Sequence, residues 1–278
     1  MKRILSALLL VLTASFTAST IVHAEDGFRS LFNGKDLTGW DGNPELWSVE
    51  DGCITGKTTG PEQLSYNQFL IWRGGVLKDF EIRVTAKVTG NNTGIQYRSK
   101  ELSDVGQWSI GGYQCDVHPA APNNAMLYDE RGRGIVAQNG QSVVIDPKGD
   151  RYLTASREPV AVDTAEWNEY TVIARGNKLI HKLNGKVTAE IVDYEDANLE
   201  LEGLLALQIH RGPAMQVQFK EILLKDLPTE APAKFTADAL PADAKPIVKP
   251  TPGAKKPAAK AKPAAKAKPA KNAASDKK

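Results

Sequence analysis

Residues 94–134 read GIQYRSKELSDVGQWSIGGYQCDVHPAAPNNAMLYDERGRG, and this stretch carries the most informative pattern in the chain. Residues 95–98 (IQYR) and residues 113–118 (YQCDVH) both alternate between apolar and polar side chains. A period of two is typical of a β-strand, because successive side chains point to opposite faces of the sheet. The pattern therefore predicts two strands that each present polar groups beside aromatic ones.

Charged, amide and imidazole side chains concentrate in this stretch. They are Arg98, Gln114, Asp116, His118, Glu130, Arg131 and Arg133. Such a set fits the floor and rim of a polar pocket. It fits equally a solvated sheet face with ion pairs, and periodicity alone does not separate the two interpretations.

On both sides of this stretch, residues 25–227 consist of short strand-like runs separated by turn signals about every 8–12 residues. The strongest hairpin signal is in residues 179–189, where Asn184-Gly185 separates two strand-like runs. Residues 203–210 and 217–224 are predicted to form a closing strand pair. No window has the period of a long amphipathic helix. The sequence therefore predicts one all-β domain built as an antiparallel β-sandwich.

The first 24 residues have the pattern of an export signal. Lys2 and Arg3 precede the mostly apolar residues 4–18, and Val22-His23-Ala24 matches a signal-peptidase site. The apolar run is too short and too often interrupted by Ser and Thr to predict a membrane span. We expect cleavage after Ala24 and a secreted or periplasmic protein with no transmembrane segment. A retained N-terminal anchor is the alternative.

Residues 228–278 are dominated by Pro, Ala and Lys, and they are predicted to be a disordered tail because they cannot bury enough apolar surface. The tail has 12 Lys and 4 acidic residues, a net charge of +8. The near-neutral chain thus combines a basic tail with an acidic domain of net charge −8. The tail is either a spacer or a contact with an anionic envelope surface. Nucleic acid is not an expected partner of an exported protein.

The sequence lacks the common motifs of metal, nucleotide and serine-hydrolase sites. There is no CxxC, HExxH or G-x-S-x-G pattern, and no glycine-rich phosphate loop. Cys53 and Cys115 are compatible with a disulfide or with two buried thiols. Calcium could be held by carboxylates such as those of Asp116 and Glu130, but nothing in the spacing demands it, so the cofactor stays open.

Several segments resemble, in order, the motifs of the 3-keto-disaccharide hydrolase family. The resemblance covers roughly residues 27–226, and its most specific segment is LFNGKDLTGW at residues 31–40. Many members of the family have Glu at the position of Gln114, and Arg211 here separates His210 from the Gly that usually follows it. The other segments are WSVEDGCI at 47–54, NTGIQYR at 92–98, GYQCD at 112–116, LYDERGRG at 127–134, EWNEY at 166–170, LNGK at 183–186 and LQIHRG at 207–212.

The resemblance implies a concanavalin/laminin-G type jelly roll and a glucoside whose C3 is oxidised to a ketone. The ketone acidifies the proton on C2, so that the C1 substituent can leave by elimination and water can add afterwards. This route needs one base, an acid for the leaving oxygen and donors at the developing enolate.

The residue types suit these roles. His210 is the first candidate for the base, because imidazole titrates in the right range; a structural, hydrogen-bonded histidine is the alternative. Asp116 is a second catalytic candidate, as base or as the partner that orients His210, and His118 is a third. Six residues are predicted to bind substrate by hydrogen bonding or stacking: Arg98, Gln114, Tyr113, Glu130, Arg131 and Trp108.

The competing hypothesis is a non-catalytic carbohydrate-binding or adhesion module, since the same fold class serves both functions. The concentration of Asp, His and Arg on one predicted face favours the enzyme.

Overall fold

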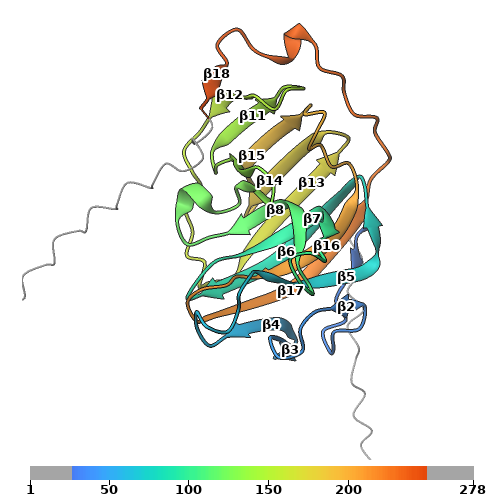
Figure 1. Cartoon of the computed structure of the whole chain (residues 1–278), viewed down its shortest axis with the longest axis vertical. Coiled ribbons are helices and arrows are strands. Elements are labelled where there is room, and N and C mark those ends of the chain that lie inside the picture. The colour runs from blue at the N-terminus through green and yellow to red at the C-terminus, as the bar shows by residue number, and fades with distance from the viewer. Residues whose placement is uncertain (1–26, 249–278) are drawn as a thin grey trace, which may run out of the picture. The chain divides into compact units, whose positions relative to one another are not determined.

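A computed structural model gives the protein's structure and describes residues 27–248. The predicted signal sequence and residues 249–278 of the predicted tail lie outside the described residues. Within residues 27–248, no helix is long and apolar enough to cross a membrane. The described chain forms two sheets that pack on each other as a sandwich, in which antiparallel pairing dominates, as predicted (Figure 1).

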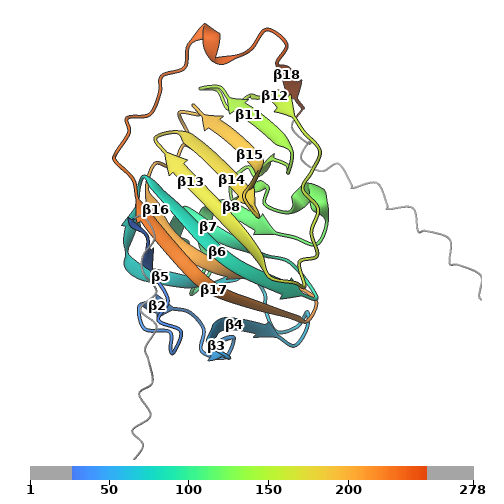
Figure 2. The same cartoon turned by 180° about the vertical axis from the view of Figure 1, so that it is seen from behind.

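The first sheet has 11 strands and runs in the order β18-β12-β11-β15-β14-β13-β6-β17-β4-β3, with β1 paired to β17. Figure 2 shows this sheet with β6, β13 and β17 side by side. One pair, β11 with β15, is parallel. Its strands are β1 (Arg29–Ser30), β3 (Trp47–Glu50), β4 (Cys53–Thr58), β6 (Phe80–Thr89), β11 (Gln141–Ile145), β12 (Arg151–Ser156), β13 (Asn168–Arg175), β14 (Lys178–Leu183), β15 (Lys186–Asp193), β17 (Met215–Asp226) and β18 (Lys245–Ile247).

The second sheet has 7 strands in the order β10-β9-β8-β7-β16-β5-β2. Two short 3₁₀ helices, η2 (Ala121–Asn123) and η3 (Ala237–Ala239), lie in the connections. Its strands are β2 (Trp40–Asp41), β5 (Gln68–Leu77), β7 (Thr93–Glu101), β8 (Ile110–Val117), β9 (Leu127–Glu130), β10 (Gly134–Ala137) and β16 (Gly203–Ile209).

The Asn-Gly hairpin is confirmed. β14 pairs with β15, and the two turn residues Asn184 and Gly185 have φ values of 48° and 76°. Left-handed backbone at both central positions is what a two-residue hairpin turn of the right twist requires. The two polar-faced strands are also confirmed as the antiparallel neighbours β7 and β8, with Ile95 opposite Cys115. Cys53 and Cys115 are free thiols, both buried.

The inward face of β7 and β8 is tied to the opposite sheet by two buried tyrosines. The Tyr97 hydroxyl lies 2.8 Å from Nε2 of His181 on β14, and the Tyr113 hydroxyl donates to Asp193 at 2.7 Å. Both tyrosine rings belong to the main apolar core between the sheets. The prediction that Tyr113 stacks on a sugar is therefore wrong, because its ring is 1% exposed and faces the other sheet.

Arg98 is fully buried and holds several segments together. Its guanidinium donates to the carbonyl oxygens of Lys78, Gly176 and Glu200 and to the carboxylate of Asp79. The side chains of Arg98 and Asp79 are 0% and 1% exposed. Arg98 reaches this position because the ladder between β7 and β8 is irregular after Tyr97 and because Arg98 has a φ of 45°. The prediction that Arg98 binds substrate is wrong, since no ligand can reach its guanidinium.

Residues 228–248 differ from the disordered tail predicted for them. In Figure 1 the segment runs from the end of β17 to β18, which pairs with the edge strand β12. The backbone N–H of Glu230 donates to Asp79 at 2.8 Å, and that of Ala233 donates to Asn177 at 2.9 Å. The prediction of disorder from composition was wrong here because the segment does not need a long apolar run to be attached. Backbone hydrogen bonds and one aromatic contact, between Phe235 and Tyr194, hold it to the domain.

Replacing Arg98 by Ala should destabilise the protein by about 3–5 kcal/mol, because it leaves the buried Asp79 carboxylate without its charged partner and removes the donor to three carbonyl oxygens. Chemical denaturation followed by tryptophan fluorescence measures the change. The exposed Lys57–Glu50 pair is the control, and Lys57→Ala should cost less than about 1 kcal/mol. Equal losses in the two variants would show that Arg98 does not hold the fold together.

Candidate active site

The outward face of the seven-stranded sheet is polar, yet its central part is buried. Gln96 on β7, Gln114 and Asp116 on β8 and Gln208 on β16 are at most 5% exposed. They alternate with the core residues of the same strands, as a period of two requires. Gly94 makes room for this row, because a Cβ atom at that position would lie 2.5 Å from Cδ of Gln114.

The amides form a chain that ends at the carboxyl of Asp116. Gln208 Nε2 donates to Gln114 Oε1 at 2.9 Å, and Gln114 Nε2 in turn donates to Asp116 Oδ1. Among residues 27–248, the buried Oε1 atoms of Gln96 and Gln208 have no hydrogen-bond partner. Buried acceptors are normally satisfied, so these two oxygens are positions for donors from water or from a ligand.

A cavity of about 380 Å³ opens on this side of the sheet, and it brings together three of the predicted site residues, His210, Glu130 and Arg131. We call it the His210 cavity. Its walls come from β9 and the turn to β10, from the residues after β16 and from the residue before β5. The lining residues are Asn67, Tyr128, Asp129, Glu130, Arg131, Gly132, Gly134, His210 and Arg211.

The contacts of His210 determine which ring nitrogen is free. Its Nδ1 lies 2.5 Å from the carbonyl oxygen of Arg211, which can only accept a hydrogen bond, and 3.4 Å from the side-chain Nδ2 of Asn91. The shorter contact requires a proton on Nδ1, so we assign the proton to that nitrogen. Nε2 then holds the lone pair, and it has no hydrogen-bond partner among the described residues. Burial lowers the pKa of His210 below its usual value, against the hydrogen bond to the Arg211 carbonyl and with a smaller contribution from the charge of Arg211, so the ring is neutral at physiological pH. His210 is thus arranged as a base.

For two carboxyl groups near the cavity, burial shifts the pKa upward rather than downward. Burial raises the pKa of Asp116 to about 8, although the bond from Gln114 opposes the shift, and the charge of Glu130 raises it further. Burial also raises the pKa of Glu130, against the bond from Asn67 at 3.3 Å and the charge of Arg131, whose Nε is 3.8 Å away. Both groups therefore retain protons at a higher pH than an exposed carboxyl, which suits a general acid.

The remaining predicted residues lie elsewhere. Asp116 and Gln114 are on the same sheet face but do not line the His210 cavity. β8 ends at Val117, so His118 is the first residue beyond the strand. Its N–H donates to Asn124, and its Nδ1 accepts from the N–H of Ala120. Trp108 lines a separate cavity.

Gln96 and Gln208 belong to the buried polar row beside the cavity, and Asn67 and Tyr128 line the cavity, but none of the four was selected from the sequence. The signal for the first two was present, since Gln96 lies in the alternating run 95–98 and Gln208 is two residues before His210. Asn67 carried no such signal, because a turn segment places it. Within residues 27–248, no group of three or more His, Cys, Asp or Glu side chains is arranged to hold a metal ion.

Comparison with known proteins agrees with the motifs. Residues 27–225 match the model of the 3-keto-alpha-glucoside-1,2-lyase-like domain. A 3-keto-disaccharide hydrolase of Bacteroides thetaiotaomicron is 36% identical over 86 residues, which are 28% of this chain and 29% of that protein. The match therefore spans less than a third of the curated relative.

Two solved structures are similar to this chain at low sequence identity. A candidate glycosyl hydrolase from Parabacteroides distasonis is 21% identical, with a TM-score of 0.47 over 73% of this chain and 94% of the other. The carbohydrate binding module CBM66 of Bacillus subtilis is 12% identical, with a TM-score of 0.44 over 68% and 96% of the two chains.

The buried carboxyl of Asp116 generates a prediction about stability and pH. The folded protein holds this proton up to about pH 8, whereas the unfolded chain releases it near pH 4. The contribution of Asp116 to stability is therefore complete below pH 4 and is lost as the pH rises toward 8. Asp116→Asn removes this loss and can still accept the bond from Gln114. Its melting temperature relative to wild type should rise by several degrees between pH 4 and pH 8.

Differential scanning calorimetry at the two pH values measures this change. Asp104→Asn, at an exposed carboxylate, is the control and should show no such pH-dependent difference. A difference for Asp116→Asn that is flat with pH, or of opposite sign, would mean that the carboxyl is ionised in the folded protein.

Proposed function

Because the chain belongs to the 3-keto-alpha-glucoside-1,2-lyase-like family, we propose that it is a carbohydrate-active enzyme that cleaves the glycosidic bond of 3-keto-glucosides. The cleavage proceeds by removal of the C2 proton, elimination of the C1 substituent and addition of water. The observation that carries this proposal is the free Nε2 of a neutral His210 in one cavity with the high-pKa carboxyl of Glu130.

Because of the ketone at C3, a base as weak as a neutral imidazole is sufficient to remove the C2 proton. When the C2 proton leaves, the electron pair moves into the ketone as an enolate, so the carbanion is stabilised by an oxygen rather than by the protein alone. Hydrogen-bond donors placed at that oxygen lower the barrier further. The two steps need no oxocarbenium ion and no pair of carboxylates at a fixed separation, unlike ordinary glycoside hydrolysis.

Three residues of the His210 cavity take the roles in this scheme. His210 Nε2 accepts the C2 proton, and Glu130 gives its proton to the glycosidic oxygen as the C1–O bond breaks. Arg131 faces the cavity with a side chain that is 46% exposed and a long contact to Glu130, so its donors can turn to the enolate. Water then adds its hydroxyl to C1 and gives its other proton to the Glu130 carboxylate, while the C2 proton returns from His210. This restores both residues and leaves a free 3-keto sugar and the departed alcohol.

His210→Ala should lower kcat on a 3-keto-glucoside with a nitrophenyl aglycone by about 10²- to 10⁴-fold, because it removes the base. Release of nitrophenol from the keto substrate and from the unoxidised glucoside is followed by absorbance. His118→Ala is the matched control and should stay within a few-fold of wild type, since His118 lies outside the His210 cavity. Release from both glucosides would indicate an ordinary glycosidase. No release, with saturable sugar binding, would indicate a binding module.

Glu130→Gln separates the acid from the base. Nitrophenol leaves without protonation, whereas a sugar alcohol needs a proton, so the variant should keep most of its rate on the nitrophenyl substrate and lose at least about 10²-fold on a 3-keto-disaccharide. In wild type, kcat/KM on the disaccharide should fall below the lowered pKa of His210 and above the raised pKa of Glu130. The variant should lose the alkaline fall. Equal losses on both substrates would remove Glu130 from the acid role.

A further inference from the structure

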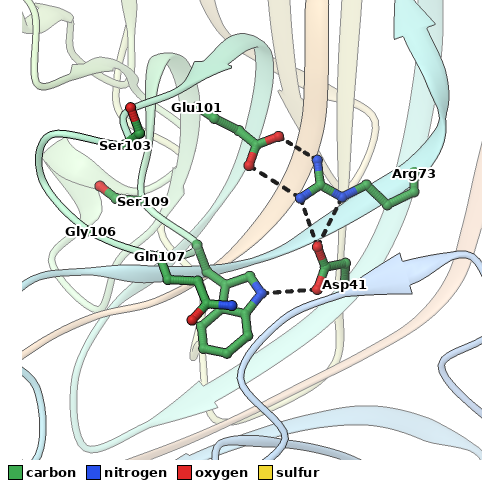
Figure 3. Close-up of a pocket in the computed structure, with 8 residues that line it drawn as sticks. Asp41, Arg73, Glu101, Ser103, Gly106, Gln107 and Ser109 are labelled. Atoms are coloured by element: carbon green, nitrogen blue, oxygen red, sulfur yellow. Dashed lines mark hydrogen bonds and ion pairs between the residues drawn. The ribbon is translucent and has the colours of Figure 1, made fainter.

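A second cavity, of about 350 Å³, lies at the β2 and β5 side of the seven-stranded sheet. We call it the Trp108 cavity. Asp41 comes from β2, Arg73 from β5, Glu101 from the end of β7, and the rest from residues 103–109 before β8 (Figure 3). It shares no lining residue with the His210 cavity. Its walls are formed by Asp41, Arg73, Glu101, Ser103, Gly106, Gln107, Trp108 and Ser109.

The structure holds the half-buried indole of Trp108 at a set angle. Its Nε1 donates to Asp41 Oδ1 at 2.9 Å, and its backbone carbonyl accepts the N–H of Phe69 at 3.0 Å. The ring also packs beside a small apolar cluster that includes Phe69 and Ile110. The φ of Trp108 is 55°, an uncommon conformation for a bulky residue. Strain of this kind persists only where surrounding contacts enforce it, and it is frequent at ligand sites.

The charges of the Trp108 cavity are already paired. Arg73 donates to Asp41 Oδ2 at 2.7 Å and to Glu101 Oε1 at 2.5 Å, as the dashed lines in Figure 3 show. The bonds from Trp108 and Arg73 hold the pKa of Asp41 below its usual value, so it is ionised. Two carboxylates against one guanidinium repel an anionic ligand, and the guanidinium has few donors left for one.

The chemistry that remains in the cavity wall suits a neutral polyhydroxyl ring. The Gln107 amide and the Ser103 hydroxyl both donate and accept, and the carboxylates retain free lone pairs. The indole supplies an apolar plane beside these groups, and sugars combine an apolar ring face with hydroxyls at the edge.

A hydrogen bond connects the segment before β5 with the segment before β8, and each segment contributes to one of the two cavities. The Tyr66 hydroxyl donates to the carbonyl oxygen of Gln107 at 3.3 Å. Asn67, which follows Tyr66, lines the His210 cavity, and Gln107 lines the Trp108 cavity. Two cavities whose walls are connected in this way suit a substrate of linked sugar units.

We propose that the Trp108 cavity is a carbohydrate subsite that binds an unoxidised sugar unit on the indole of Trp108. The identity of this sugar unit rests on the proposed function: it is the leaving sugar of the 3-keto-disaccharide. The Trp108 cavity then makes the enzyme prefer saccharide leaving groups to small aglycones.

Isothermal titration calorimetry of the mature protein with maltose and with cellobiose tests the subsite without any turnover. We expect saturable binding of at least one disaccharide, weakened roughly threefold to tenfold by Trp108→Ala and also by Gln107→Ala. Gln107 is exposed, so its variant addresses the subsite even if Trp108→Ala folds poorly. Trp167→Ala is the matched control and should bind as wild type, because this half-buried tryptophan packs under Lys87 and Lys220 on the other sheet.

Three results would overturn the subsite. The first is no binding of either sugar, and the second is binding that Gln107→Ala and Trp108→Ala leave unchanged while His210→Ala abolishes it. The third is binding of the cation choline with none of either sugar. If the protein binds sugar through Trp108 but does not cleave a 3-keto-glucoside, the proposed function is refuted and the subsite is not. Cleavage with no such binding would refute the subsite alone.

Discussion

The buried ion pair between Arg98 and Asp79 is the interaction on which the arrangement of the sheets depends. Arg98 donates to the turns that follow β5 and β13 and to the segment before β16, while Asp79 accepts the backbone N–H of Gly176 and of Glu230. A buried charge is tolerated only when it is paired and its donors are used, and five hydrogen bonds from one guanidinium meet this requirement. The pair thereby attaches the C-terminal segment and both sheets to one point.

The candidate active site follows from the way this framework treats the two faces of β7 and β8. Tyr97 and Tyr113 bond across the core and so tie their strands to the opposite sheet. The amides and Asp116 on the outward face are consequently held on a rigid support. Catalytic groups need such a support, because small errors in position cost much of the rate.

Burial shifts the pKa values of the titratable groups at the site, and the shift has opposite signs for histidine and for the carboxyl groups. It lowers the pKa of His210 and raises the pKa of Asp116 and Glu130. A neutral base can therefore coexist with carboxyl groups that hold their protons to a higher pH than usual, as the proposed elimination requires. The same burial costs stability, because Asp116 must keep a proton that the unfolded chain releases, and the buried oxygens of Gln96 and Gln208 lack partners. Such local costs are common where a structure is prepared for a ligand.

By itself, the sequence determined the fold class, the strand-like runs 95–98 and 113–118, the Asn184-Gly185 turn and the family, because alternation and turn chemistry are local properties that tertiary contacts reinforced here. The second run was predicted one residue too long, since β8 ends at Val117. It also identified His210, Glu130 and Arg131, which the structure brings to one cavity. Only the tertiary structure decided which face of each strand looks inward. A period of two defines two faces but not their neighbours, so Tyr113 became core. The irregularity after Tyr97 took Arg98 inside, and His118, one residue beyond the end of β8, does not line the His210 cavity. The order of residues 228–248 was decided in the same way, since their partners, Asp79, Asn177 and the edge of β12, are remote in the chain and leave no local pattern.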